Sequence, residues 1–202
     1  MKRILGILSV CVFCLSCGNQ VSGPTYDLKG YQTDDIGGGA TAAEFASQGG
    51  KVLATGHTIN GVRTGMWTSY HANEPKIKTI TNYINGKKNG MEITIDERGY
   101  LTNIAGYRND QLHGVSGLYK NGRTVNETTY ANGVMNGPFK IYDDKSGVIQ
   151  RSGFMKNGKQ DGELLYFKPD GSVSMRYQYR EGEKVSGGIV TCLLYTSDAA
   201  DE

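Results

Sequence analysis

The chain has 202 residues, a formal net charge of +2 and 29 glycines, and only 38% of its residues are hydrophobic. The balanced charge excludes a protein that binds nucleic acid through a concentrated basic surface, so we expect no nucleic-acid partner. The low hydrophobic share and the abundant glycine argue against a deep globular core.

The N-terminus has the layout of a secretory signal, with two cations before an apolar run over residues 4–15. This run is shorter than the roughly 20 apolar residues that a membrane-spanning helix needs. The next residues, Leu15-Ser16-Cys17, resemble the lipobox of bacterial lipoproteins, although Cys14 stands where an aliphatic residue is usual. The resemblance implies a signal peptide over 1–16 and a lipid on Cys17. A plain cleaved signal and an uncleaved anchor are the alternatives.

The lipoprotein resemblance also implies a location. Gly18, rather than an aspartate, follows the cysteine, which argues against retention in the inner membrane. We therefore expect a lipid-anchored protein of the bacterial cell envelope, at the outer membrane. Residues 17–54 hold few large apolar side chains and include the run Gly37-Gly38-Gly39, so we expect a flexible tether after the lipidated cysteine.

From residue 55 onward the chain repeats itself. An Asn-Gly pair followed four residues later by a second glycine recurs, with a degenerate copy at Asn109-Asp110. The second turn residues are Gly61, Gly86, Asp110, Gly133, Gly158 and Gly182, which are 25, 24, 23, 25 and 24 residues apart. Further turn signals, such as Arg98-Gly99 and Asp170-Gly171, fall between them. The repeat is therefore about 24 residues long and contains two turns.

The segments between the turns are typical of β-strands. They are five to eight residues long and rich in Thr, Tyr, Ile and Val. Asn-Gly pairs suit tight hairpin turns, and a lone hairpin is at best marginally stable, so neighbouring hairpins must pair. The sequence predicts an all-β fold over residues 55–191, an elongated single-layer antiparallel meander of about five to six hairpin repeats. We expect the copies with Asp110 and Ile95 to be irregular.

The repeat units carry a family resemblance. Tyr83 to Gly90 and Met155 to Tyr166 resemble the MORN-repeat variant that is abundant in bacteria, often labelled as YwqK-family antitoxins. The resemblance implies a β-hairpin repeat that binds other molecules, and its family label implies an antitoxin or immunity-type inhibitor.

The C-terminal residues 192–202 differ in kind from the repeats. Cys192 to Glu202 match one translated frame of a widely used sequencing adaptor. We exclude this tail from the fold and expect the native sequence to depart from it near Thr191, so that the repeat array is truncated. With the signal and the tail set aside, Cys17 is the one remaining cysteine, so we expect no disulfide and no thiolate metal site.

Recurrent aromatic residues are the candidate binding surface. Such residues more often hold a thin sheet together, but Trp67 is the single tryptophan and we expect it to be partly exposed on the sheet. The candidate surface comprises Trp67, Tyr70, Tyr119, Tyr142 and Phe167. The histidines show no ligand spacing and no catalytic motif is present, so we expect no metal, no cofactor and no enzymatic activity.

Three functions fit the sequence. The first is a non-enzymatic scaffold or interaction module in the envelope that binds a protein or a glycan. The second is the antitoxin or immunity-type inhibitor. The third is an accessory module of an enzyme whose C-terminal part is missing.

Overall fold

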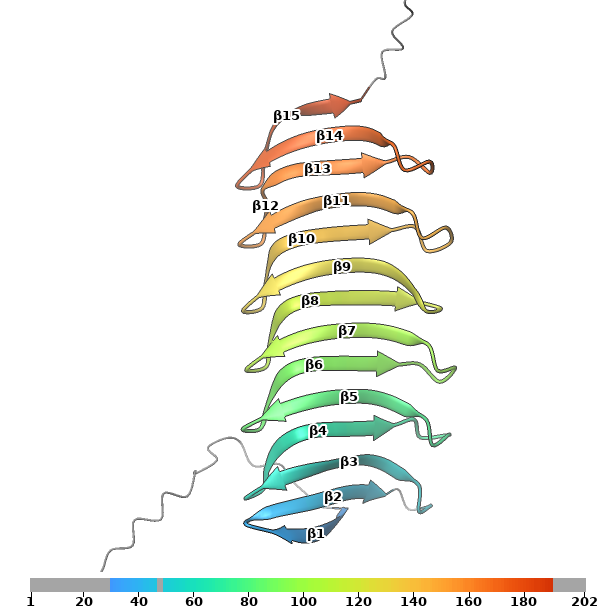
Figure 1. The fold of residues 1–202 in the computed structure, drawn as a ribbon, viewed down its shortest axis with the longest axis vertical. Helices are drawn as coiled ribbons and strands as arrows, with labels where there is room; N and C mark the ends of the chain where they lie inside the picture. Colours follow the sequence, from blue (N-terminus) through green and yellow to red (C-terminus); the bar gives the residue numbers. More distant parts are fainter. Residues whose placement is uncertain (1–29, 47–48, 191–202) are drawn as a thin grey trace, which may run out of the picture.

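The computed structural model describes residues 30–46 and 49–190. All strands of this part of the chain form one antiparallel sheet, in which consecutive hairpins follow one another along a single long axis (Figure 1). The predicted all-β, single-layer meander is confirmed. The strands are β1 (Tyr31–Gly37), β2 (Ala40–Ala46), β3 (Val52–Ile59), β4 (Val62–Tyr70), β5 (Ile77–Ile84), β6 (Lys87–Ile95), β7 (Leu101–Arg108), β8 (Gln111–Lys120), β9 (Arg123–Ala131), β10 (Val134–Tyr142), β11 (Ile149–Lys156), β12 (Lys159–Gln160), β13 (Gly162–Phe167), β14 (Val173–Arg180) and β15 (Glu183–Ile189).

The Asn-Gly pairs close the turns along one edge of the sheet, which we call the Asn-Gly edge. Asn85 and Gly86 have φ angles of 50° and 76°, a left-handed conformation that asparagine and glycine tolerate better than other residues. The degenerate copy keeps this turn, because Asn109 and Asp110 have φ angles of 49° and 68°. The expectation that this copy is irregular is therefore wrong at its turn.

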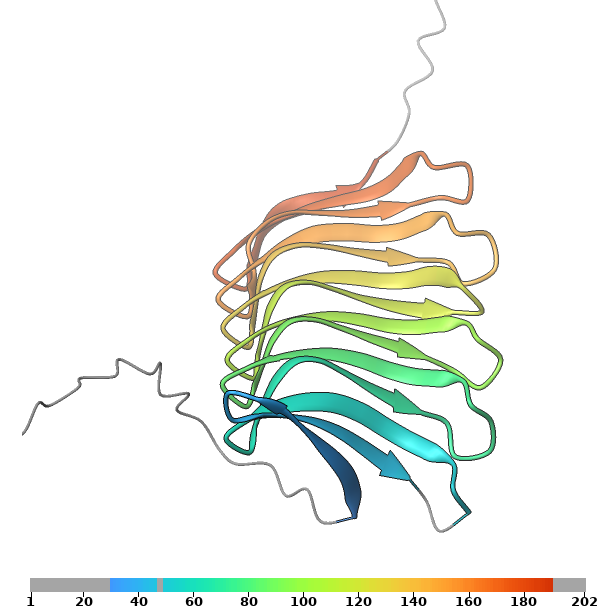
Figure 2. The ribbon, with the colours of Figure 1, turned by 60° about the horizontal axis from the view of Figure 1, so that its bottom comes forward.

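The second glycine of each repeat produces a bend. Gly90 has a φ of 100° and lies opposite Tyr107, and the register of the β5–β6 pair shifts between Thr81 and Tyr83. Between the pairs that these two residues form, β6 has two residues more than β5, and extra residues in one strand of a pair bend that strand and increase its twist. Each hairpin accordingly curves near the Asn-Gly edge (Figure 2).

The two faces of the sheet differ in burial. One row of paired side chains runs across the strands, and this row defines what we call the buried face. The residues directly before and after each member of the row point to the opposite side of the sheet, which we call the open face. On this face Met66, Met91 and Val115 are 61%, 55% and 60% exposed. The row contains Trp67, Thr81, Glu92, Ala105, Ser116, Thr128, Phe139 and Gly153 in successive strands, then Leu164, Tyr177 and Gly187.

Neighbouring hairpins are also joined at the Asn-Gly edge. The backbone N–H of Gly86 donates to the carbonyl oxygen of Arg63 at 2.9 Å, and the same bond recurs in each later repeat. These recurring bonds join Asp110 to Lys88, Gly133 to Leu112, Gly158 to Met135 and Gly182 to Gln160, at 2.8 to 3.0 Å. Each repeat is therefore stabilised by the one before it, as in other repeat proteins.

The sheet begins earlier than the sequence predicted. The expected tether over 17–54 contains β1, β2 and the first residues of β3, so the prediction is wrong for residues 31–46 and 52–54. The run Gly37-Gly38-Gly39 has φ angles of 90°, 63° and 77° and forms a hairpin turn. Glycine suits a tight turn as well as a flexible linker, so the glycine content of this segment alone could not distinguish a hairpin from a tether.

The predicted terminal segments lie outside the described residues. These are the signal peptide over 1–16, Cys17 with the residues up to 29, and the tail over 192–202. In the part of the chain that the structure covers, no helix has the length and apolar character needed to cross a membrane.

Candidate functional site

A cluster of three aromatic rings lies on the buried face near the start of the sheet. The Trp67 indole lies over Gly56, where an added Cβ would stand 2.1 Å from ring atom Cδ2. Its Nε1–H donates to the carbonyl oxygen of His57 at 3.0 Å. The ring meets those of Tyr31 and Tyr83 edge-on, with centroids 6.0 and 6.5 Å away. This arrangement is favourable for aromatic rings, and it ties β1 and β5 to β4.

The expected partial exposure of Trp67 is wrong, because the residue is only 6% exposed. Gly56 in the neighbouring strand leaves room for the indole to lie flat across the sheet. Arg63 covers the same cluster, with its guanidinium 4.0 Å from the centroid of the Tyr83 ring and Nη1 donating to the Tyr83 hydroxyl at 2.8 Å. Trp67 therefore packs the sheet rather than presenting a contact surface.

Two other candidate residues lie on the open face. The Tyr119 ring lies over Gly117, where a Cβ would stand 2.9 Å from the phenol oxygen. The Tyr142 hydroxyl donates to Glu127 Oε2 at 2.7 Å, and Glu127 lies opposite Gly117 in the β8–β9 pair. Burial, this hydrogen bond and the carboxylate charge raise the pKa of Tyr142 to about 12. Tyr119 and Tyr142 thus share one part of the open face.

The five predicted residues do not form one surface. Tyr70 lines a shallow hollow with Val52 and Thr55 near the start of the sheet, and Phe167 lines another with Val148 and Ile149 near its end. The sequence itself indicates that Trp67 and Tyr70 lie on opposite faces of the sheet. They are three residues apart, and an odd spacing within a strand places two side chains on opposite faces.

A closed polar cluster occupies the buried face at β5–β7. Lys88 Nζ lies 2.5 Å from Glu92 Oε2, and Thr81 Oγ1 donates to the same oxygen at 2.9 Å. Burial lowers the pKa of Lys88, but the hydrogen bond to Glu92 and its charge raise that pKa by more. Burial, followed by the charge of Glu92, raises the pKa of Tyr107, whose ring lies 4.8 Å from Lys88 Nζ. The ion pair is satisfied internally.

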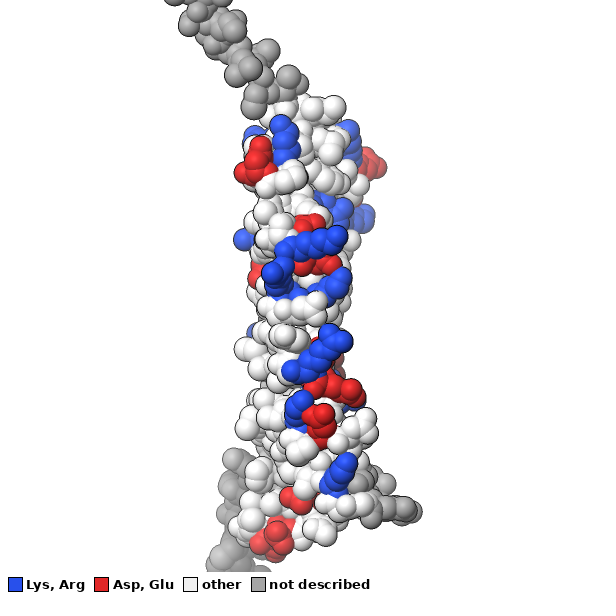
Figure 3. Space-filling model, turned by 90° about the vertical axis from the view of Figure 1, so that its right-hand side faces the viewer, with Lys and Arg blue, Asp and Glu red and all other residues white. Residues whose placement is uncertain are grey.

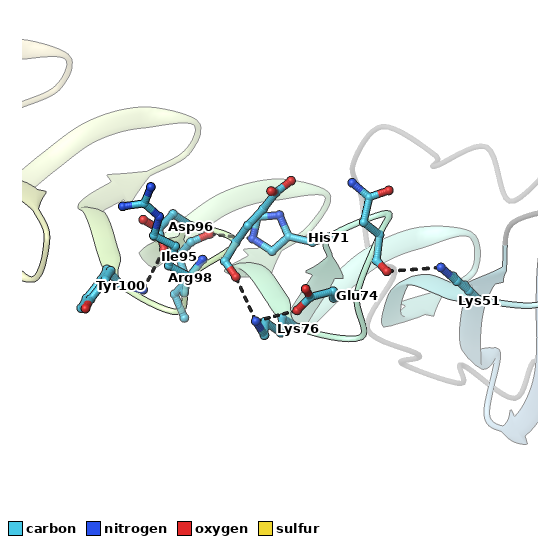
Figure 4. Close-up of polar contacts among 10 residues, drawn as sticks. Lys51, His71, Glu74, Lys76, Ile95, Asp96, Arg98 and Tyr100 are labelled. Carbon is cyan, nitrogen blue, oxygen red and sulfur yellow. Dashed lines mark hydrogen bonds and ion pairs between the residues drawn. The ribbon is translucent and has the colours of Figure 1, made fainter.

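The second edge of the sheet, which we call the loop edge, carries the longer turns. His71 Nε2 lies 2.9 Å from the carbonyl oxygen of Ile95, and Lys76 Nζ donates to that of Glu97 at 3.1 Å, so one turn is joined to the next (Figure 4). Cations and carboxylates are interspersed along this edge (Figure 3), and some are paired, as in Lys120 with Asp144. This edge therefore lacks the single sign of charge that would attract a polyanion.

The carboxylates of the loop edge act as turn acceptors. Asp96 Oδ1 accepts hydrogen bonds from the backbone N–H groups of Arg98 and Tyr100 at 3.0 and 2.8 Å. The backbone and hydroxyl of Ser146 donate to Asp143 and lower its pKa. These contacts are ordinary turn chemistry. Within residues 30–46 and 49–190, no three His, Cys, Asp or Glu residues gather in a way that could hold a metal ion.

The buried face holds a further cluster, around Arg151, that the sequence did not single out. The Arg151 guanidinium carbon lies 5.7 Å from the centroid of the Phe139 ring and 5.9 Å from that of Tyr166. The Tyr166 ring in turn meets Tyr177 edge-on at 6.1 Å. Arg151 lies directly opposite Tyr166 in the β11–β13 pair, so the sheet register brings these groups together.

Comparison with known proteins adds no relative to this description. The chain matches no family model, and no curated protein is significantly similar to it. The geometry of the sheet is therefore the support for the candidate sites.

Proposed function

We propose that the chain is a non-enzymatic, lipid-anchored protein of the bacterial cell envelope that binds a protein or glycan partner along its sheet. The observation that carries this proposal is the continuous meander, in which equivalent positions recur on both faces in every hairpin. Extended repeat arrays of this kind offer long binding surfaces.

The spacing between Cys17 and the sheet supports an anchored module. The first strand begins at Tyr31, which is 14 residues after Cys17 (31 − 17). A chain spans at most about 3.5 Å per residue, so β1 would lie within about 50 Å of a lipid on Cys17. The reach of the sheet from the membrane is therefore shorter than a tether up to residue 54 would give it.

Metabolic labelling with an alkyne fatty acid tests the anchor. We expect the full chain to incorporate the label and to fractionate with membranes. The Cys17→Ser variant should lose the label, because it lacks the thiol to which the lipid would attach. Label on the Cys17→Ser variant, or its absence from the unmodified chain, would contradict the anchor.

Cross-linking from envelope membranes tests the interaction module. We expect envelope glycan or several envelope proteins to be captured by the full chain. A single stoichiometric toxin-like partner would instead favour the inhibitor function. Capture of neither kind of molecule at saturating cross-linker would overturn the interaction proposal.

A further inference from the structure

We propose that Arg151 and the rings around it form a binding site for a carboxylate-bearing saccharide. The site comprises Phe139, Arg151, Tyr166, Tyr177 and Lys184, on the buried face between β10 and β15. This inference deepens the proposed function and rests on it only for the role of the sheet as a binding module.

The guanidinium of Arg151 lies between two aromatic rings. Its carbon is 5.7 Å from the centroid of Phe139 and 5.9 Å from that of Tyr166, within the range of cation–π attraction. The Phe139 ring lies across Gly153, where a Cβ would stand 2.9 Å from ring atom Cε1. Two flat apolar surfaces thus flank one cation.

Apart from the two rings, Arg151 has no partner within the described residues. Its side chain makes no hydrogen bond or ion pair there, and its Nε is enclosed without an acceptor. Two other cations on the same face differ in this respect, since Arg63 donates to the Tyr83 hydroxyl and Lys88 pairs with Glu92. The two terminal nitrogens of Arg151 are neither enclosed nor bonded within the described residues, so they remain open to a ligand.

The guanidinium geometry indicates a carboxylate as the group that is bound. Because Nε is enclosed, Arg151 can donate hydrogen bonds to a ligand from its two terminal nitrogens, and this fork matches one carboxylate. Lys184 Nζ lies 4.1 Å from the centroid of the Tyr177 ring and places a second cation nearby. A ligand with carboxylates spaced along it would therefore meet both cations.

A saccharide fits this surface better than a peptide does. The site lies on the face of the sheet, where backbone pairing is not available to an extended peptide. Aromatic rings on β10, β13 and β14 can instead stack against the apolar faces of sugar rings. Phe139 and Tyr166 stand on next-but-one strands, about 10 Å apart by strand spacing, which is comparable to the length of a disaccharide.

Calorimetric titration of the full chain with trigalacturonic acid tests the proposal, with neutral galactotriose as the matched sugar. We expect binding of the acidic trisaccharide that weakens with added salt, and at least tenfold weaker binding of the neutral one. Arg151→Met should weaken acidic binding at least tenfold, Arg151→Lys should have a smaller effect, and the exposed control Arg98→Met should have none.

Stability measurements separate this role from a structural one. Because Arg151 has no hydrogen-bonded or ionic partner, Arg151→Met should lose only its cation–π contacts with Phe139 and Tyr166, and we expect its thermal midpoint to fall by no more than about 4 °C. A larger fall would mean that Arg151 mainly supports the fold and would overturn the proposal. Equal binding of the neutral sugar, or an unchanged affinity in Arg151→Met, would also overturn it.

Competing ligands test the chemical class. Tighter binding of inorganic phosphate, or of an acidic peptide, than of trigalacturonic acid would overturn the saccharide assignment. If no acidic saccharide binds while envelope cross-linking still captures partners, this inference fails and the proposed function stands. If cross-linking also captures nothing, both fail.

Discussion

At the scale of single residues, large rings on the buried face lie over glycines in the adjacent strand. Trp67 lies over Gly56 and Phe139 lies over Gly153. A single-layer sheet has no second layer to fill gaps, so a ring must lie flat on its own sheet to be buried. Glycine is the residue that allows this close approach.

We predict that Gly56→Ala destabilises the fold by about 1–3 kcal/mol, the usual cost of overpacking a core. An added Cβ would stand 2.1 Å from the Trp67 ring, so the indole must move. Gly188→Ala is the matched control, because nothing lies within 4 Å of its added Cβ. Urea unfolding measures both variants, and an equal loss in the two would contradict the packing argument.

We predict that Tyr142 titrates near pH 12 rather than near its ordinary value of 10.0. A raised pKa favours the neutral phenol in the fold. The contribution of this phenol to the free energy of unfolding is therefore fully present below about pH 10 and is lost as the pH rises toward about 12. Glu127→Gln should lower this pKa toward, but not to, the ordinary value, because burial remains the larger cause.

Tyrosinate absorbance at alkaline pH, compared with that of Tyr142→Phe, isolates the Tyr142 titration. A difference curve centred near pH 10 would show that neither burial nor Glu127 affects this phenol.

At the scale of the hairpin, the turn with Asp110 shows how a repeat tolerates a substitution. Asp110 occupies the position of a turn glycine, with φ at 68°. Its backbone N–H donates to the Lys88 carbonyl oxygen at 3.0 Å, and its Oδ1 accepts from the Lys88 N–H at 2.7 Å. The second bond compensates for the left-handed backbone and adds a link between repeats.

We predict that Asp110→Ala costs about 2 kcal/mol, of which about 1 comes from the left-handed backbone and about 1 from the lost hydrogen bond. Asp110→Gly loses the bond but relieves the backbone, so its stability should stay within about 0.5 kcal/mol of the unmodified chain. Urea unfolding compares the two variants. Equal stability of the alanine and glycine variants would refute this account of the turn.

The hairpins could be predicted from sequence where the turn chemistry is specific. Few residues other than Asn and Gly accept positive φ, so the recurring Asn-Gly pairs indicated the Asn-Gly edge directly. The β1–β2 hairpin was missed because it turns on three glycines without an asparagine. The candidate site was predicted less well, because the Arg151 cluster depends on which residues lie opposite one another in β10, β11 and β13, and register does not show in residue spacing.

At the scale of the whole molecule, stability is a sum of hairpins and the contacts between neighbours. Trp67 contacts Tyr31 and Tyr83, so it joins the first hairpins of the sheet. Tyr166 and Tyr177 join the last ones. A defect at one end should therefore remain local.

We predict that Trp67→Ala costs about 3–5 kcal/mol locally and speeds amide exchange in β3–β5, while β13–β15 keep their protection. Met66→Ala is the control, since Met66 is its exposed neighbour and should change exchange little. Amide hydrogen exchange followed by mass spectrometry measures both variants. A uniform loss of protection over the whole sheet would contradict nearest-neighbour coupling.

The most direct test of the open, extended meander is a pair of spin-label distances measured by dipolar spectroscopy. Met66, Val115 and Glu163 occupy equivalent exposed positions on β4, β8 and β13, and each interval spans four strand steps of the sheet. With the four cysteines of the chain replaced by serine, the 66–115 and 66–163 separations should be about 19 and about 38 Å. A second distance that is about twice the first supports the meander, and one that is equal or shorter would show that the sheet closes on itself.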